Sequence, residues 1–394
     1  MTWPLSQRLH SFTPSATVSI SNLASQMKAE GEDVINLAVG EPDFDTPNHV
    51  IEAAIMAMNA GQTRYTNVAG TLALRQAVCD KYQRDNLLSY QVQQVLVSNG
   101  AKQSIYNLTV ALLNVGDQVI LPAPYWVSYS AMVTMTGAKC VTISCPASQA
   151  FKLTAAQLAN AITPATKLLI LNSPSNPSGQ AYSPSELMAI GKVLRVNPHV
   201  VIVSDDIYEH IYWGQEPLVN LLNVCPDLIN RCVLVNGVSK AYAMTGWRIG
   251  YAVGPEAIIA AMTNVQVESS SCASSISQAA ALAALEGPQG ILAPMVKAYQ
   301  RRHNYVVEQI NMMPGLKALP SQGTFYSFVD CSGAMTQLNY QNDVDLLKDL
   351  LASTGVALVP GSAFGLPDHF RLSYATDMAV LQLACGRLKK FFTH

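Results

Sequence analysis

The stretch CVLVNGVSKAYAMTGWRIGYAVG, residues 232–254, decides the fold. It holds two short apolar runs, CVLVN and IGYAV, on either side of a segment that contains one lysine and one arginine. Runs of the same kind precede it, separated by segments long enough for helices: VLVS (95–98), QVIL (118–121), KLLILN (167–172) and VVIVSD (200–205). Such alternation is typical of a mostly parallel sheet that is covered on both faces. We therefore expect an α/β fold with a ligand at the carboxyl ends of the strands.

The chain changes pattern after about residue 290. A long helix is expected near 291–311, followed by shorter strands and helices at 324–330, 342–353, 356–360, 370–374 and 377–392. At 394 residues the chain is longer than a single core usually supports, a limit of roughly 250–300 residues. We predict a large domain over residues 46–290 and a smaller α+β domain over 291–394. Residues 1–45 are expected to form an arm and a piece of the small domain.

Composition and simple motifs argue against several classes of protein. Lys and Arg number 24 and Asp and Glu number 26, so no excess charge attracts nucleic acid or an anionic membrane. The first residues do not read as a secretory leader, and no apolar run of about 18 residues occurs. The eight cysteines form no C-x-x-C pair and the seven histidines no H-E-x-x-H motif. We expect a cytoplasmic protein with buried thiols and without a metal, a membrane partner or a nucleic-acid partner.

Lys240 and Arg248 are the first candidates for chemistry. Lys240 follows an apolar run and is flanked by small residues rather than acids, and burial there would lower its pKa and free a nucleophilic amine. Arg248 lies between Gly246 and Gly250, which allow close backbone approach, and its guanidinium can hold a phosphate through two hydrogen bonds. Alone, Lys240 would be better explained as a surface lysine in a loop. The pair suggests an anionic cofactor with a carbonyl group.

Two polar side chains follow other predicted strands. Asp205 ends the run VVIVSD, where a buried carboxylate requires a cation such as a protonated pyridine nitrogen. The competing interpretation is that Asp205 or Asp206 is a helix N-cap. Asn176 lies in NSPSNPSG (172–179), a segment that an ordinary Asn-Pro turn would also explain.

The segment SNGAKQ (98–103) joins a predicted strand to a predicted helix. Its residues Gly100, Ala101 and Lys102 would form the first helical turn, where free backbone N–H groups and the helix dipole favour a phosphate. The sequence holds no G-x-G-x-x-G fingerprint and no nucleotide P-loop. The turn is weak evidence when taken singly.

Taken together, these segments resemble the class I aminotransferases of the aspartate aminotransferase superfamily, which have pyridoxal-phosphate fold type I. The resemblance spans about residues 10–392 and follows the order of the family. The stretches that carry it are LAVGEPDFDTP (37–47), TRYTNVAGTLALR (63–75), SNGAKQ (98–103), PYWVSY (124–129), NSPSNPSG (172–179), SDDIYE (204–209), SKAYAMTGWRIGYA (239–252) and RLSYA (371–375). It implies a cofactor-binding large domain and a substrate that is an amino acid or a keto acid.

The resemblance implies four roles at the reacting centre. Lys240 would hold pyridoxal phosphate covalently and move a proton between the substrate Cα and the cofactor carbon. Asp205 would keep the pyridine nitrogen protonated, which makes the ring an electron sink. Tyr208 and Asn176 would hydrogen-bond the ring oxygen.

The resemblance also assigns the ring face and the phosphate. Trp126 would stack on the ring, with Tyr125 as the second choice. Arg248 and the backbone of residues 100–102 would hold the phosphate. Many relatives place a serine three residues before the lysine as a further phosphate contact, whereas this chain has Gly237 there. Ser239 is one candidate to take over that contact.

Two residues would bind the substrate α-carboxylate. Arg371, in the apolar strand FRLSY, would clamp it through its guanidinium. The backbone at Gly40 would assist. A surface position for Arg371 is a poor alternative because its neighbours are apolar.

Three positions bear on the partner subunit and on the substrate side chain. Tyr65 would reach the phosphate of a neighbouring subunit's site, so the resemblance implies a homodimer with shared active sites. Lys102 and the segment PSAT (14–17), through Ser15 and Thr17, resemble a subgroup that binds acidic substrates without the distal arginine of better-known members. We therefore expect L-aspartate with 2-oxoglutarate as the substrates, by a ping-pong mechanism. The alternative is that Lys102 faces solvent and the arm serves dimer packing.

Other functions stay open at lower weight. Within the same fold, the chain could be an aminotransferase for aromatic, alanine or prephenate-type substrates, or a β-lyase; absence of Lys102 and Ser15 would have favoured these. A cofactor-sensing transcription regulator would carry a basic DNA-binding module in front, and the first 45 residues have no such pattern. A serine hydrolase is disfavoured because no G-x-S-x-G occurs.

Overall fold

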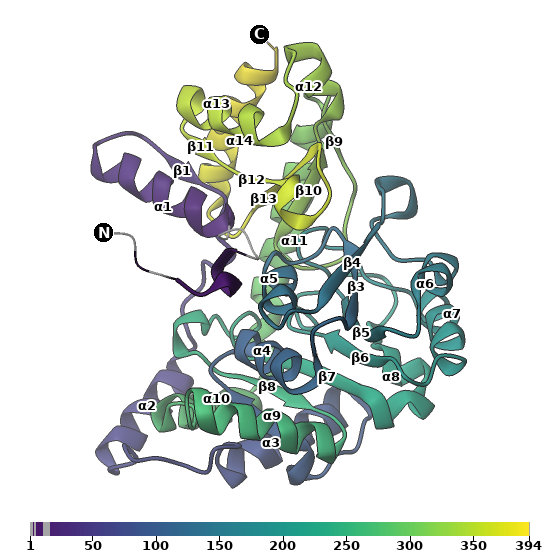
Figure 1. The fold of residues 1–394 in the computed structure, drawn as a ribbon. Coiled ribbons are helices and arrows are strands. Elements are labelled where there is room, and N and C mark those ends of the chain that lie inside the picture. The colour runs from purple at the N-terminus through teal and green to yellow at the C-terminus, as the bar shows by residue number, and fades with distance from the viewer. Residues whose placement is uncertain (1–2, 4, 11–15, 394) are drawn as a thin grey trace.

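The computed structural model describes residues 3, 5–10 and 16–393. A seven-stranded sheet lies at the centre of its larger part, in the order β2-β8-β7-β6-β5-β3-β4 (Figure 1). The strands are β2 (Val95–Ser98), β3 (Gln118–Ala123), β4 (Lys139–Ser144), β5 (Thr166–Asn172), β6 (Val201–Asp205), β7 (Cys232–Gly237) and β8 (Gly250–Val253). All neighbours in the sheet are parallel except β8, which is antiparallel to both β2 and β7. The predicted α/β class with a mostly parallel sheet is confirmed.

Alternation along the strands divides the core into two layers. On β7, Val233 and Val235 belong to one hydrophobic cluster, whereas Cys232 and Leu234 belong to the other. The first layer is filled by α4 (Ala101–Leu112), α5 (Ser128–Met135) and α9 (Glu256–Ser269). The second is filled by α2 (Asn48–Asn59), α3 (Leu72–Asn86), α6 (Ala155–Ala161), α7 (Pro184–Arg195), α8 (Leu221–Val224) and α10 (Ser275–Glu286). Because both faces are covered, the strands are apolar on both sides and read as continuous runs.

The link between β7 and β8 explains why β8 runs antiparallel. Only the twelve residues 238–249 join the two strands, and they form no α-helix. A parallel return normally requires a crossover of at least that length, usually with a helix. The antiparallel return places the end of β7 and the start of β8 at the same edge of the sheet. Lys240 and Arg248 therefore both lie at the carboxyl edge of the parallel strands.

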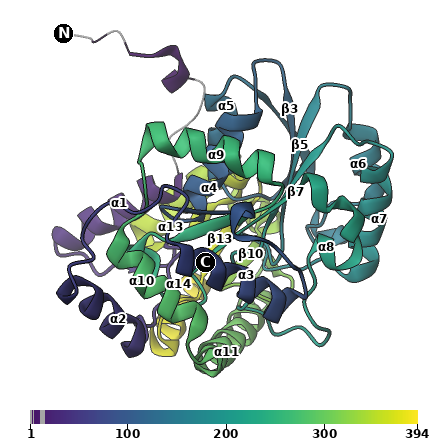
Figure 2. The same cartoon turned by 90° about the horizontal axis from the view of Figure 1, so that it is seen from below.

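The C-terminal part holds a second, smaller sheet in the order β12-β13-β10-β9 (Figure 1). Its strands are β9 (Lys317–Ala318), β10 (Tyr326–Asp330), β12 (Val359–Pro360) and β13 (His369–Ser373). It packs with α11 (Leu292–Asn311), α12 (Ser332–Leu338), α13 (Asp343–Thr354) and α14 (Met378–Thr393). The N-terminal segment joins this part of the molecule, because β1 (Ile35–Asn36) pairs in parallel with β11 (Val356–Ala357), and α1 (Ala16–Ala29) packs beside them. Figure 2 shows α6, α7 and α8 gathered at the right of the view and α2 at the lower left, so these helices of the second layer lie toward different ends of it.

Several details differ from the sequence prediction. The run VALVP (356–360) is split between two sheets, as β11 and β12, rather than forming one strand. All eight cysteines are free thiols, but Cys140 and Cys272 are only partly buried.

Among the described helices none is by itself long and apolar enough to cross a membrane, although the bent pair 275–286 and 289–311 would pass on length and composition alone.

Candidate active site

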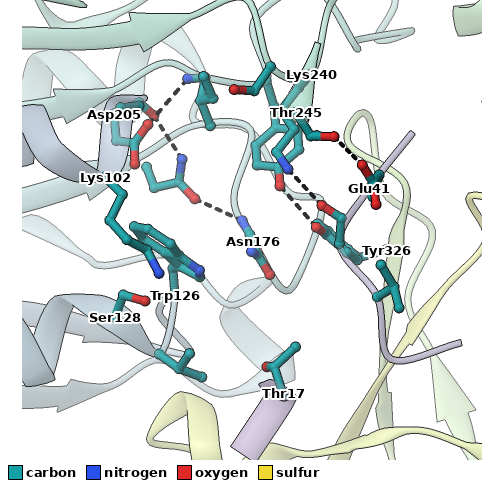
Figure 3. A pocket seen from close by; sticks show the side chains of 18 of the residues that line it. Thr17, Glu41, Lys102, Trp126, Ser128, Asn176, Asp205, Lys240, Thr245 and Tyr326 are labelled. Carbon is teal, nitrogen blue, oxygen red and sulfur yellow. Dashed lines mark hydrogen bonds between the residues drawn. The ribbon is translucent and has the colours of Figure 1, made fainter. Parts of the chain in front are cut away.

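A cavity of about 400 Å³ opens at the carboxyl edge of the large sheet, between that sheet and the C-terminal part (Figure 3). Strand ends, the first turn of α4, the start of α5 and the link 238–249 all contribute to its walls. Twelve residues singled out in the sequence line it together: Thr17, Gly40, Ala101, Lys102, Trp126, Asn176, Asp205, Tyr208, Ser239, Lys240, Arg248 and Arg371. Residues more than 350 positions apart therefore face one space.

Lys240 presents its amine to this cavity. Its Nζ donates to the Gly40 carbonyl at 2.6 Å, which joins the end of the large sheet to the N-terminal segment. Burial lowers the pKa of Lys240 to about 8, and the positive charges of Arg371 and Arg248 act in the same direction. The carboxylates of Glu41 and Asp205 oppose that shift. An amine in this state is a competent nucleophile near neutral pH.

Asp205 ends β6 with its carboxylate buried in the cavity wall. Burial raises the pKa of Asp205 to about 6, and a hydrogen bond from Tyr129 opposes the rise. The Tyr129 hydroxyl donates to Oδ2 at 2.5 Å, and the backbone N–H of Ile207 donates to Oδ1 at 3.3 Å. Asp205 does not cap a helix, since an α-helix does not begin there. A carboxylate held in this way is suited to a cationic ring nitrogen.

The turn after β2 forms an anion cradle. Gly100 is the N-cap of α4 with φ +84°, a conformation that favours glycine, and no side chain caps the turn in the described part of the chain. A Cβ at Gly100 would collide with the Arg248 guanidinium, which donates to the Asn99 and Thr245 carbonyls. The N–H groups of the first turn and a guanidinium thus converge on one position, as a phosphate requires.

The structure gives a physical reason for Gly237. A Cβ on that residue would lie 2.9 Å from both the Gly250 Cα and the Ile249 carbonyl, which is closer than side-chain carbons approach. A serine cannot stand there while β7 and β8 pair this tightly. Ser239, two residues later, does line the cavity. Gly250 is packed in the same way against Gly100 and Ala101, but Gly246 has open space around it, so the expectation that Gly246 permits close backbone approach is wrong.

Arg371 is the most completely buried cation of the site. Its guanidinium donates to the Asn176 amide oxygen at 3.0 Å and to the Ala38 carbonyl at 2.6 Å. Its Nε has no hydrogen-bond partner among the described residues. A buried donor without an acceptor is costly, so this edge of the guanidinium suits a carboxylate ligand.

Lys102 and Trp126 lie side by side on the wall of the cavity (Figure 3). The Lys102 Nζ lies 5.0 Å from the centroid of the Trp126 ring, and burial lowers the pKa of Lys102, with Arg248 adding to the effect. Trp126 packs edge-on against Tyr129. Tyr125 lines a different, small cavity, so of the two aromatic candidates only Trp126 faces the site.

Two sequence candidates do not line the cavity, and a third falls outside the described residues. Gly100 sits directly behind the cavity wall, in contact with Arg248. Tyr65 is 92% exposed and does not line the cavity of its own chain. Ser15 falls outside the described residues, whereas Thr17 of the same segment reaches the cavity.

The further lining residues to which the sequence did not point include Glu41, Tyr129, Thr245 and Tyr326. Glu41 accepts a hydrogen bond from Thr245, which ties the N-terminal segment to the link 238–249. Tyr129 could have been found, because it follows Trp126 by three residues at the start of a helix. Tyr326 carries no such signal, since an aromatic residue in an apolar strand is ordinary core.

A second cavity of about 240 Å³ lies beside Asp206 and Glu209. Asp85, Glu209 and His210 bring ligand-type atoms within 4.8 Å of one another there. These carboxylates already have cationic partners, because Lys81 pairs with Glu209 and Arg84 pairs with Asp85. We assign no ligand to this cavity.

Known protein families and sequence relatives agree with this arrangement of the site. The family profile "Aminotransferase class I and II" fits residues 32–388. An aspartate/prephenate aminotransferase of Nitrosomonas europaea is 48% identical over 390 residues, covering 98% of each chain. An aspartate aminotransferase of Rhizobium meliloti is 47% identical, covering 97% of this chain and 94% of that protein.

Solved structures agree with the sequence relatives. The aspartate aminotransferase from Rhizobium meliloti superimposes with a TM-score of 0.94 at 45% identity, over 99% of this chain and 98% of that one. The aspartate aminotransferase from Thermus thermophilus with maleate gives a TM-score of 0.93 at 38% identity, over 99% and 100% of the two chains. The predicted fold and family are confirmed. The chain belongs to the class I and II aminotransferases, which are enzymes that depend on pyridoxal phosphate.

Proposed function

We propose that this enzyme transfers the amino group of L-aspartate to 2-oxoglutarate, giving oxaloacetate and L-glutamate by a ping-pong mechanism. The observation that carries the proposal is that two cations line one cavity. They are buried Arg371, whose Nε has no partner among the described residues, and Lys102 beside Trp126. A dicarboxylic substrate has two anionic ends, and each would meet one fixed cation. Full-length relatives named as aspartate aminotransferases support the same choice.

The residues of the cavity fit pyridoxal phosphate. The uncapped turn 100–102 and Arg248 form a cradle for its phosphate, and Ser239, which lines the same cavity, would contribute a hydroxyl. Asp205 would face the pyridine nitrogen, and Trp126 would cover the ring. Tyr208 and Asn176 would hold the ring oxygen. Lys240 would carry the covalent link.

When bound, the cofactor supplies an electron-withdrawing ring that stabilises negative charge at the substrate Cα. The chain's own residues do the rest. Arg371 would fix the α-carboxylate, with the Gly40 backbone beside it, so that the Cα–H bond points at Lys240. The Lys240 amine, once free, would take the Cα proton and return it at the neighbouring carbon. Asp205 would hold a proton on the ring nitrogen, because a nearby carboxylate favours the charged pyridinium.

Specificity for an acidic side chain would come from Lys102, Thr17 and Ser15. Lys102 and Thr17 line the same cavity as Lys240. The Thermus thermophilus relative was solved with maleate, a compound with two carboxylates, which supports a site for two negative ends.

Prephenate is a second candidate acceptor. The relative from Nitrosomonas europaea is named an aspartate/prephenate aminotransferase at 48% identity. Prephenate also carries two carboxylates, so Arg371 and Lys102 could serve both acceptors.

We propose further that the enzyme is a homodimer in which Tyr65 completes the phosphate site of the other subunit. Tyr65 is exposed in the isolated chain and needs a partner surface to act on a ligand. Large apolar side chains are also exposed on α2 nearby in the sequence: Ile51, Ile55, Met56 and Met58.

The division of the chain at residues 45 and 290 remains our proposal as well. It is supported by the large sheet, which lies entirely within residues 95–253, and by the pairing of β1 with β11. Eight free thiols support a cytoplasmic location.

The test is spectroscopic. Purified enzyme loaded with pyridoxal phosphate is mixed with single amino acids, and the cofactor absorbance is followed for conversion to the amino form. We expect conversion at far lower concentrations of aspartate and glutamate than of alanine or phenylalanine. A preference for a neutral or aromatic amino acid would contradict the substrate, and prephenate is then tested as acceptor for the amino form. Absence of a chromophore after adding the cofactor would contradict the cofactor site itself.

A further inference from the structure

Tyr326 lines the cavity, although none of the proposed catalytic or binding roles falls to it (Figure 3). It lies at the start of β10, opposite Ser373 of β13, and is 1% exposed. Its hydroxyl is 3.0 Å from the hydroxyl of Tyr208. Either oxygen can donate in this pair. Tyr208 is the residue proposed to hydrogen-bond the ring oxygen of the cofactor.

The ring of Tyr326 makes a second contact. The Arg371 guanidinium carbon lies 4.3 Å from the centre of that ring, within the range of a cation–π interaction. The hydroxyl end is also close to the backbone of Gly40, where any Cβ would collide with it. Tyr326 therefore touches the proposed carboxylate clamp with its ring and the proposed ring-oxygen contact with its hydroxyl.

We infer that Tyr326 is a positioning residue with two separable functions: its hydroxyl orients and polarises the Tyr208 hydroxyl toward the cofactor ring oxygen, and its ring supports Arg371. This inference rests on the proposed function. When Tyr208 donates to the cofactor, its oxygen is free to accept, and Tyr326 is the hydroxyl placed to donate to it. Hydrogen bonds arranged in a chain strengthen one another, so Tyr208 becomes the better donor.

Burial and the neighbouring charged groups keep the hydroxyls of Tyr208 and Tyr326 protonated and in place. Both phenols are buried, and burial raises the pKa of each, so both keep their protons at neutral pH. The charged groups that act on the pair are Arg371 and Asp205. Arg371 is itself fixed by Asn176 and the Ala38 carbonyl. The pair is thus held in a fixed geometry away from water.

Substitution can separate the two functions. Tyr326→Phe removes the hydroxyl and keeps the ring, whereas Tyr326→Leu removes both. In the loaded enzyme the pH titration of the absorbance of the lysine-bound cofactor reports how well its ring oxygen is stabilised. The titration midpoint of Tyr326→Phe should move upward by about 0.5–1 pH unit, the effect of losing one buried hydrogen bond.

The same substitution made in a Tyr208→Phe background should have no further effect, because Tyr326 acts through Tyr208. Affinity for succinate, a dicarboxylate without an amino group, is the readout for the clamp. Tyr326→Phe should leave it within about twofold, and Tyr326→Leu should weaken it by roughly five- to twentyfold through loss of the cation–π contact. Tyr374→Phe, at a buried tyrosine that does not line the cavity, is the control and should titrate as the wild type.

The outcomes distinguish this inference from the proposed function. If the wild type holds no cofactor, the proposed function fails before Tyr326 is tested. If the wild type titrates normally and Tyr326→Phe has the same midpoint, the inference is overturned. Equal shifts from Tyr326→Phe with and without Tyr208 would also overturn it, because the hydroxyl would then act by another route.

Discussion

Burial lowers the pKa of the Lys240 amine to about 8. Attack on the cofactor carbonyl requires the neutral amine, so the rate at which pyridoxal phosphate attaches to the apoprotein should rise with pH, with a midpoint near 8. An ordinary lysine would give a midpoint near 10.5. Stability of the apoprotein should also rise as the pH increases from about 8 toward 10.5, because only the unfolded state still holds the proton in that range.

The measurement is stopped-flow absorbance at a series of pH values, with Lys240→Ala as the variant that gives no covalent signal. A midpoint close to that of a free lysine would mean that the buried environment does not act on the amine.

Lys102 is predicted to determine specificity. Lys102→Ala should lower kcat/KM for aspartate by about 10- to 100-fold, the value of one charge-assisted hydrogen bond. Activity with alanine should change by no more than about twofold, because alanine has no second carboxylate. Lys192→Ala, at an exposed lysine on α7, controls for loss of a positive charge in general. Equal losses with both substrates would assign Lys102 to the phosphate instead.

For single residues, the sequence and the family resemblance predicted most charged groups of the cavity and Tyr208, but not Glu41, Tyr129 or Tyr326. Lys240, Asp205 and Arg371 could be predicted because each lies in or next to an apolar run and because the resemblance to a family gave each a role. Alone, Lys240 would be explained as a surface lysine and Asp205 as a helix cap. Tyr326 could not be predicted, because a buried tyrosine fits any core, and Tyr129 had only its spacing from Trp126 as a signal. The three-dimensional contacts with Asp205 and Tyr208 reveal the use of both residues.

Among the elements, the pairing of β7 with β8 has the clearest consequences. Gly250 packs so closely on the turn at Gly100 and Ala101 that a Cβ would overlap their backbone. Gly250→Ala should therefore destabilise the protein by about 1–3 kcal/mol and displace the phosphate cradle. Gly246→Ala is the matched control, because nothing lies within 4 Å of a Cβ there.

Thermal unfolding and the dissociation constant for pyridoxal phosphate measure the two effects. The expected result is a lower Tm and weaker cofactor binding for Gly250→Ala only. Similar values for both variants would show that the turn can adjust to the extra carbon.

The sequence predicted most of these elements but not how they pair. Apolar runs marked β2, β3, β5, β6, β7 and β8, and the helix predicted at 291–311 is α11. The run VALVP gave no sign that its two halves belong to different sheets, because pairing with β1 depends on a segment more than 300 residues earlier. β4 was missed, since exposed Lys139, Thr142 and Ser144 interrupt its apolar residues and leave no continuous apolar run.

For the whole molecule, the prediction concerns the shared site. If Tyr65 acts on the other subunit, Lys240→Ala and Tyr65→Ala dimers should each be impaired, but their mixture should recover activity after subunit exchange. Half of the exchanged dimers are hybrids, and each has one intact site, so activity should approach about a quarter of the wild type.

Sedimentation of each variant at the assay concentration verifies that the dimers form. No recovery in exchanged mixtures would mean that Tyr65 serves its own chain or none.

The position of Trp126 on the cavity wall has a practical consequence. The chain has only four tryptophans, and this one faces the space in which the ring of the cofactor is expected. Trp247, whose indole donates to Thr46, lies on the link that also carries Lys240. Indole emission overlaps the absorbance of bound pyridoxal phosphate, so binding of the cofactor should quench the intrinsic tryptophan fluorescence. The intrinsic tryptophan fluorescence would therefore report the binding of the cofactor in real time, without an added dye.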